Sequence, residues 1–183
     1  MNQLNSILLE INSKYQMKPR LTSEPSCSVS MARSLDKDRS NIEQFIAHNF
    51  YQSYQAQVDH FADLLIGCKS DEDHNWMAAF GMSKLTNKKA YLEQYLDQPI
   101  EHYISALTGK KVERSEVFEL GNLAADYPGA TRRLIKKMTS VIYNQGGRWV
   151  VFTVNKLVLN AFHKSNLNPQ VISKADPHRL PNH

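Results

Sequence analysis

The chain has 183 residues, of which 42% are hydrophobic and 22% are charged, an ordinary composition for one globular domain that buries a core. No apolar run approaches the roughly 20 residues that span a bilayer, and residues 1–10 lack the basic region of a secretory signal, so we expect a cytoplasmic protein. The net charge of +4 favours anionic partners such as phosphates or acidic membranes. Acidic residues spread throughout the chain weaken this preference for anions, and nucleic acid is not an expected partner.

Metal chemistry is not predicted. Cys27 and Cys68 are the only cysteines, and without metal-ligand spacing they are expected to be free thiols in a reducing compartment. The seven histidines show no H-E-x-x-H or other paired-ligand spacing. The sequence also lacks a G-x-S-x-G nucleophile turn and a Walker phosphate loop.

The N-terminal segment is predicted to form a helix followed by a linker. Its apolar residues repeat at helical spacing, and they are Leu4, Ile7, Leu8, Ile11 and Tyr15. Pro19–Ser26, with two prolines and several small polar residues, is typical of a linker. We therefore expect residues 1–26 to precede the domain, residues 27–175 to form it, and residues 176–183 to be a loose tail. Alternating apolar and small polar residues at 27–31 predict the first strand.

Helices and a hairpin are predicted in the middle of the chain. Asp38 or Ser40 is expected to cap a helix over residues 41–57, whose apolar residues form one stripe. Two strands joined by the acidic turn at residues 70–74 are predicted at residues 61–69 and 75–85. A second helix, with a proline near its start and a glycine stop, is predicted over residues 97–109.

Residues 90–96 are apolar and aromatic, and they predict either a strand or the approach to the second helix. Within and just after this run lies a polar group that consists of Glu93, Gln94, Tyr95, Asp97 and Glu101. They are candidates for binding an amine substrate or for orienting another carboxylate. Asp97 is equally well explained as a helix cap and Tyr95 as a core residue.

The most informative stretch predicts a strand–helix–strand unit. Residues 117–123 form an apolar strand that contains one carboxylate, Glu119. The turn at residues 126–131 opens a helix with four basic residues, and two glycines end this helix before a second strand at residues 148–154. With a last strand at residues 171–173, the order of elements indicates a mixed α/β (α+β) domain.

Glu119 is the first candidate for a catalytic residue. Strand alternation places it on a face with Val117, Gly121 and Leu123, so its carboxylate is expected in an apolar setting. Burial would raise its pKa toward the working range of a general base. The alternatives are a Glu119 that faces solvent or pairs with a nearby lysine.

The turn before the basic helix is a candidate phosphate site. Backbone amides of Gly129, Ala130 and Thr131 would allow a close approach of phosphate at a helix N-terminus. Arg132 and Arg133 would add charge-assisted hydrogen bonds. The alternative is an ordinary helix start after a Pro-Gly break.

The basic helix is amphipathic, and two interpretations of it are open. Its apolar stripe consists of Leu134, Ile135, Met138, Val141 and Ile142. A toxin would use such a helix at a membrane surface. The strand–helix–strand context favours burial of the stripe against a sheet.

Residues 153–167 resemble the end of the GNAT N-acetyltransferase core. The matching positions are Asn155, Val158, Phe162, Asn166 and Leu167. This resemblance implies a GNAT-like mixed central sheet flanked by helices, with Leu123, residues 129–133 and Asn155 binding CoA or a carrier-protein thioester. Two positions depart from the GNAT pattern. Phe162 stands where many GNAT enzymes have a proton-donating tyrosine, and Asp126 stands where they favour Gln or Arg.

Residues 92–101 together with Phe118–Ala124 resemble the bacterial thermostable hemolysin family, and the similarity extends over about residues 39–176. This family in turn resembles acyl-homoserine-lactone synthases, which carry an acidic residue on the strand equivalent to 117–123. Asn122 stands where those synthases have an arginine, and it joins the candidate substrate-binding residues.

The resemblance implies an acyltransferase that moves an acyl group from a CoA or carrier-protein thioester to a small-molecule amine, with Glu119 as the base. Two alternatives stay open. The first is a hemolysin, released from the cell, that acts directly on lipid or erythrocyte membranes. The second is a non-catalytic module that binds acyl-CoA, which the departures at Phe162 and Asp126 favour.

Overall fold

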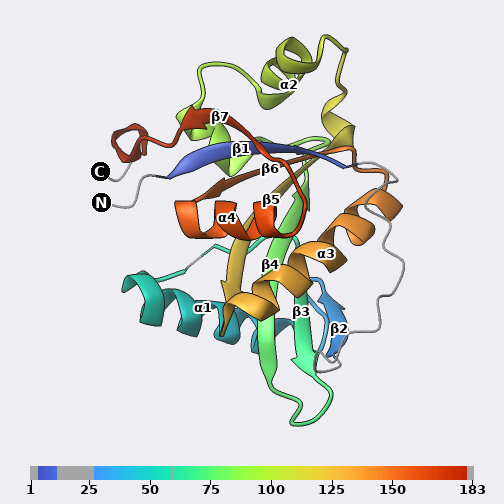
Figure 1. Cartoon of the computed structure of the whole chain (residues 1–183), viewed down its shortest axis with the longest axis vertical. Coiled ribbons are helices and arrows are strands. Elements are labelled where there is room, and N and C mark those ends of the chain that lie inside the picture. The colour runs from blue at the N-terminus through green and yellow to red at the C-terminus, as the bar shows by residue number, and fades with distance from the viewer. Residues whose placement is uncertain (1–3, 12–26, 59, 181–183) are drawn as a thin grey trace. The chain divides into compact units, whose positions relative to one another are not determined.

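The computed structural model describes residues 4–11, 27–58 and 60–180. Its strands form a seven-stranded mixed sheet in the order β2-β3-β4-β5-β6-β1-β7 (Figure 1). The strands are β1 (Asn5–Glu10), β2 (Cys27–Ala32), β3 (Leu64–Ser70), β4 (Trp76–Lys84), β5 (Val117–Ala125), β6 (Trp149–Val154) and β7 (Gln170–Lys174). The helices are α1 (Arg39–Tyr54), α2 (Ile100–Thr108), α3 (Pro128–Asn144) and α4 (Lys156–Lys164), with short 3₁₀ helices η2 (Tyr91–Tyr95), η3 (Arg114–Glu116) and η4 (Pro177–Arg179). The predicted fold class is confirmed.

The described residues cluster into two compact units. The first unit comprises Met1–Gln16, Lys84–Glu119 and Thr139–His183, and the second comprises Met17–Ser83 and Leu120–Met138, as far as the structure describes them. β5 and α3 each contribute to both units. Every contact described below lies within one unit.

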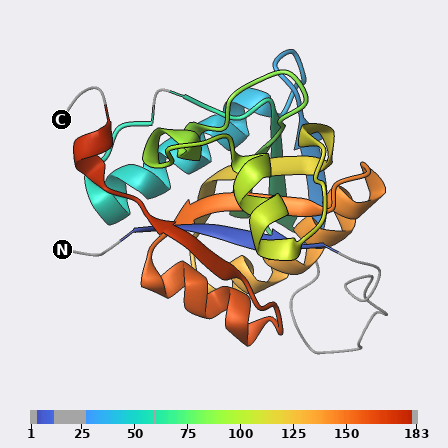
Figure 2. The same ribbon diagram turned by 90° about the horizontal axis from the view of Figure 1, so that it is seen from above.

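β1 is the principal correction, because the N-terminal segment is a strand and not the predicted helix. It pairs antiparallel with β6 on one side and with β7 on the other (Figure 2). Ile7, Leu8 and Leu9 are at most 3% exposed, so β1 is buried on both faces. Such a strand is a continuous apolar run, and in a short segment that run also fits helical spacing. Tyr15 and the predicted linker Pro19–Ser26 lie outside the described residues.

The core of the first unit consists of apolar side chains from β1, η2, α2 and β6, among them Leu8, Leu92, Ile104 and Val151. The prediction of α2 is confirmed, and the helix ends where Gly109 adopts the left-handed φ of 67°. Within the predicted tail the structure describes residues 176–180. These residues form η4, and the N–H of Ala175 just before them donates to Leu4 O at 3.1 Å.

The second unit contains the meander β2–β3–β4, with the predicted hairpin in antiparallel register from Leu64↔Met82 to Lys69↔Trp76. The core on one face combines α1 with strand residues, including Ile42, Ile46, Leu65 and Ala79. Asp38 occupies the N-cap position of α1 without a side-chain cap bond. Its carboxylate instead accepts a hydrogen bond from Ser30 Oγ at 2.9 Å and lies 3.7 Å from Lys69 Nζ.

Candidate functional site

Glu119 lies on β5 in the first unit, and its carboxylate binds the start of η2. Oε2 accepts the N–H of Tyr91 at 2.7 Å, and Oε1 accepts the N–H of Leu92 at 2.8 Å. Glu119 is therefore partly buried, and each of its carboxylate oxygens accepts a backbone N–H.

The environment of Glu119 raises the pKa of its carboxyl group. Burial is the largest cause, and the negative charge of Glu93 acts in the same direction. The hydrogen bonds from Leu92 and Tyr91 and the charge of Lys88 oppose the shift without cancelling it. A carboxylate in this setting holds a proton more readily than a solvated one, as a general base near neutral pH requires.

η2 forms where its sequence and its neighbours supply acceptors for free backbone donors. The first N–H groups of a helix have no partner inside it. Glu93 Oε2 reaches back to the N–H of Ala90 at 2.8 Å, and Glu119 takes the N–H groups of Tyr91 and Leu92. Three successive amides are thus bound by two carboxylates, so the predicted choice between strand and helix approach at residues 90–96 resolves to a 3₁₀ helix.

Glu93 is held ionised by Arg114. Arg114 Nη2 and Nη1 donate to the two Glu93 oxygens at 2.7 and 2.8 Å, and Glu93 Oε1 also accepts the N–H of Ile100 at 2.8 Å. Burial pushes the pKa of Glu93 upward, but the hydrogen bonds from Arg114, Ile100 and Ala90 outweigh it and leave the pKa below its ordinary value.

All five N–H bonds of Arg114 are used within this cluster. Besides Glu93, Nη1 donates to Glu101 Oε2, and Nε and Nη2 donate to the carbonyl of Lys88 at 3.0 and 2.7 Å. The cluster therefore contains two neighbouring carboxylates with opposite pKa shifts, Glu93 lowered and Glu119 raised. In such a pair the carboxylate with the lowered pKa can stay charged while the one with the raised pKa can accept a proton.

Arg114→Ala is expected to lower the free energy of unfolding by about 3–5 kcal/mol, because it leaves the Glu93 carboxylate buried without its cation. The Glu93 side chain is only 10% exposed. Urea denaturation followed by circular dichroism measures the change. Lys111→Ala is the matched control, since Lys111 and Glu113 form an exposed pair and its loss is expected to leave the midpoint unchanged. Equal midpoints for Arg114→Ala and the control would show that Arg114 does not support the cluster.

Two other candidate residues of the first unit have structural partners. Tyr95 is buried in the core, and burial, followed by the charge of Tyr91, raises the pKa of its phenol. Asp97 is not the cap of α2, since Pro99 occupies that position. The Asp97 carboxylate accepts instead from Arg179 Nη2 at 2.7 Å.

Asn122 belongs to the second unit and adopts a left-handed φ of 53° within β5. Its Oδ1 accepts the N–H of Ala62 at 3.0 Å, and its Nδ2 donates to His60 O at 3.1 Å. Gly81 is required beside it, because a Cβ there would lie 2.7 Å from Asn122 Oδ1. The two hydrogen bonds of the Asn122 side chain thus hold residues 60–62 next to β5.

The predicted phosphate loop forms the first turn of α3 in the second unit. The N–H groups of Ala130 and Thr131 donate to the carbonyl of Tyr127 at 3.0 and 3.4 Å. Gly129 lies against the Tyr127 ring. A Cβ at position 129 would lie 2.8 Å from this ring. The Asp126 carboxylate accepts from Asn49 Nδ2 at 3.3 Å.

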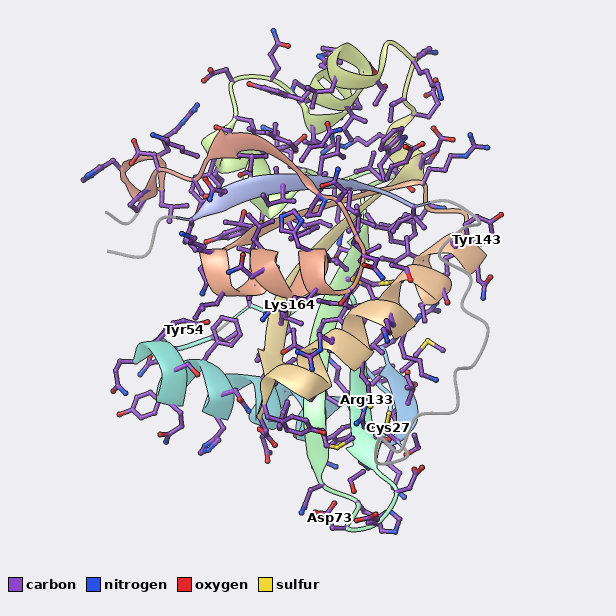
Figure 3. The ribbon with its side chains drawn as sticks, viewed as in Figure 1. Cys27, Tyr54, Asp73, Arg133, Tyr143 and Lys164 are labelled. Carbon is purple, nitrogen blue, oxygen red and sulfur yellow. The ribbon has the colours of Figure 1, made fainter. Side chains whose placement is uncertain are left out.

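The basic residues of α3 differ in exposure. Arg132 is exposed, whereas Arg133 is partly buried on the side of α3 where Cys27 lies on β2 (Figure 3). Both cysteines are free thiols, as predicted. Burial and the Cys27 thiol raise the pKa of Cys68 to about 12, although Arg133 and Lys137 oppose this shift.

The apolar stripe of α3 is buried: Leu134, Ile135, Met138 and Ile142 are at most 2% exposed. The interpretation that the apolar stripe of α3 is buried is therefore confirmed for these four residues. Leu123, another candidate for donor binding, is partly buried in β5.

Asn155 begins α4 in the first unit. Its Oδ1 accepts the N–H of Val158 at 3.0 Å, so the matched Asn and the residue three positions later form a helix cap. Phe162 is 1% exposed and stacks on Phe152 with ring centroids 4.6 Å apart. Phe162 is therefore a core residue of the first unit.

Arg114 and Arg179 were not predicted as part of the site. The partners of Arg114 lie 13–26 positions away in the sequence and those of Arg179 lie 82–84 positions away, so no local pattern identifies them. Among the residues that the structure describes, no group of three or more His, Cys, Asp or Glu side chains is arranged to hold a metal ion. Within the same residues, no helix has both the length and the apolar character needed to cross a membrane.

Solved structures define the class of fold. The acyl-homoserine-lactone (AHL) synthase LasI superposes with a TM-score of 0.52 and 9% identity over 77% of this chain and 78% of that one. The GCN5-related glucosamine N-acetyltransferase region of a fungal GH3 β-N-acetylglucosaminidase superposes with a TM-score of 0.55 and 12% identity, over 93% of this chain and 20% of that longer one. The chain thus has a GNAT-like fold that it shares with these acyltransferases.

The family is also defined. The model of the thermostable hemolysin family matches residues 32–183, so this chain belongs to that family. No curated protein sequence matches the chain. β1 and most of β2 lie before the matched region.

Proposed function

We propose that this protein transfers an acyl group from a CoA or carrier-protein thioester to a small-molecule amine, with Glu119 as the general base. The observation that carries the proposal is the largely buried Glu119 carboxylate, whose pKa is raised beside the ionised pair of Glu93 and Arg114. The GNAT-like fold, found in an AHL synthase and a glucosamine N-acetyltransferase, supports the same class of reaction.

In the proposed reaction Glu119 accepts a proton from the amine while the amine nitrogen attacks the thioester carbonyl. The new C–N bond forms, the C–S bond breaks, and water protonates the leaving thiolate. Glu119 is suited to this step because each oxygen holds one backbone N–H and retains a lone pair for the proton. Glu93 stays ionised and raises the basicity of Glu119 through its charge.

The donor is proposed to contact Leu123, residues 129–133 and Asn155. Since the amides of Ala130 and Thr131 already donate to Tyr127, we assign the direct phosphate contacts to the Gly129 amide and to exposed Arg132. Asn155 acts through the cap that fixes the start of α4. Glu93, Tyr95, Asp97 and Asn122 remain the proposed acceptor-side residues, with Glu93 acting through its charge.

The test is an acyl-transfer assay with a panel of acyl-CoA and acyl-carrier-protein donors and a panel of amines. We expect free thiol to appear only when donor and amine are both present. Calorimetry with CoA tests donor binding separately. Folded protein that releases no thiol and binds no CoA at millimolar concentration would contradict the proposal, and saturable binding without turnover would identify a binding module instead.

The pH dependence of kcat/KM is expected to report on Glu119. The base must be deprotonated to act, so kcat/KM rises as the pH passes upward through its pKa. Because that pKa is raised, the midpoint of the acidic limb should lie above the ordinary carboxyl value of 4.5. Arg132→Ala is the control, since it should raise the KM for the donor and leave the midpoint in place. A midpoint at or below 4.5 would assign the limb to another group.

Hemolysis is a second candidate activity, favoured by membership of the thermostable hemolysin family. Purified protein and its Glu119→Gln variant, each incubated with erythrocytes, separate two routes. Lysis that persists in the variant would indicate direct action on the membrane. Lysis that needs both active protein and substrates would indicate a surface-active product.

A further inference from the structure

Arg179, in η4, binds the C-terminal end of η2, whereas Glu119 binds the N-terminal end. Its Nη1 donates to the carbonyl of Tyr95 at 2.8 Å, and its Nη2 donates to the carbonyl of Leu96 at 3.2 Å and to Asp97 Oδ1 at 2.7 Å. The last carbonyls of a helix have no partner inside it. η2 is therefore held by a carboxylate at its N-terminus and by a guanidinium at its C-terminus.

We propose that Arg179 is a positioning residue of the Glu119 site: by fixing the C-terminal end of η2, it keeps the Tyr91 and Leu92 amides on the Glu119 carboxylate. η2 has only five residues, so a shift at one end is carried to the other. The inference rests on the proposed function for its effect on turnover, but its structural part can be tested without activity.

The guanidinium of Arg179 comes from an anchored segment. Asp176 Oδ1 accepts the N–H of His178 at 3.0 Å and so caps η4. On either side, buried Ala175 belongs to the core of the first unit, and Leu180 packs against it. From this anchored segment the planar guanidinium of Arg179 reaches three acceptors at once. The single ammonium group of a lysine does not reproduce this set of hydrogen bonds.

The charged groups that shift the pKa of Glu119 are different from the group with which Arg179 forms an ion pair. Those charges come from Glu93 and Lys88, while the acidic partner of Arg179 is Asp97. An effect of Arg179 on Glu119 must therefore travel through η2. Loss of the two amide hydrogen bonds would raise the pKa of Glu119 further, because these bonds favour its charged form.

Hydrogen exchange of the Tyr91 and Leu92 amides tests the structural part in Arg179→Ala. We expect the Tyr91 and Leu92 amides to exchange at least about tenfold faster. The amide of Gly109 is the internal control, because it donates to Ser105 O at 2.9 Å at the end of α2, outside η2. Arg148→Ala is the matched control variant, since Arg148 forms an ion pair with Glu116 and its side chain is 72% exposed. Unchanged exchange at Tyr91 and Leu92, or equal acceleration at Gly109, would overturn the inference.

Kinetics test the functional part. Arg179→Ala is expected to lower kcat by about 10- to 100-fold, the effect of a small misplacement of a catalytic group, and to move the acidic limb of kcat/KM to higher pH. Arg179→Lys should not restore either property, because it keeps the charge pair with Asp97 and loses the fork. An active wild type with an unchanged Arg179→Ala profile would overturn the inference. An inactive wild type would contradict the proposed function, and amide exchange would still decide the role of Arg179.

Discussion

Glu119→Gln is expected to lower kcat for acyl transfer by about 10²–10⁴, the contribution of a positioned general base, while the chain stays folded. Glutamine keeps the volume of the side chain and one carbonyl oxygen, so it can accept one of the two N–H groups that Glu119 binds. The other N–H loses its partner, which costs about 1–3 kcal/mol. Removal of a buried charge offsets part of this cost.

The matched control is Glu116→Gln, three positions earlier, because Glu116 is partly exposed and pairs with Arg148 at 3.3 Å. Its turnover should equal that of the wild type. Thermal melting of both variants establishes that they are folded before turnover is compared. A stable Glu119→Gln protein with unchanged turnover would remove Glu119 from the mechanism.

Deletion of residues 1–11 is expected to abolish cooperative unfolding, because it removes an interior strand. Ile7, Leu8 and Leu9 are each at most 3% exposed. Burial of one such side chain stabilises a protein by about 1.5–3 kcal/mol, so three of them approach the total stability of about 5–15 kcal/mol of a typical domain. The deletion would also leave β6 and β7 without the strand that pairs with both of them.

Single substitutions measure the contribution of β1 to stability in smaller steps. Leu9→Ala should lower the free energy of unfolding by about 2–5 kcal/mol, as large-to-small changes in cores do. Leu4→Ala is the matched control, since Leu4 is 41% exposed and its truncation should cost less than about 1 kcal/mol. Urea denaturation measures both. Equal stabilities for Leu9→Ala and Leu4→Ala would show that β1 contributes little to the fold.

Most of the fold could be predicted because its signals are local. The turn at residues 70–74 defines the β3–β4 hairpin, Gly109 ends α2, and alternation defines β2. β1 could not be predicted in this way, because its partners β6 and β7 lie almost a whole chain away. A six-residue strand with three consecutive apolar residues does not contain enough periods to separate a strand from a helix.

The candidate site shows the same division. Glu119 stands out as a carboxylate within an apolar strand, and Glu93 as one within an aromatic run. Their partners did not stand out, because Arg114 and Arg179 lie in unremarkable polar segments and meet η2 only in the folded chain. The opposite pKa shifts of the two carboxylates depend on those distant contacts, so residue type alone does not indicate them.

The position of β1 also constrains the order of folding during synthesis. Of the seven described strands β1 leaves the ribosome first, whereas β6 and β7, the strands on both its sides, leave it last. The apolar residues Ile7, Leu8 and Leu9 therefore have no strand partner until residues 149–174 have been translated. Pairing across such a sequence separation is slow, and exposed apolar strands aggregate during the delay. The yield of native protein should thus depend on chaperones more strongly than its size suggests.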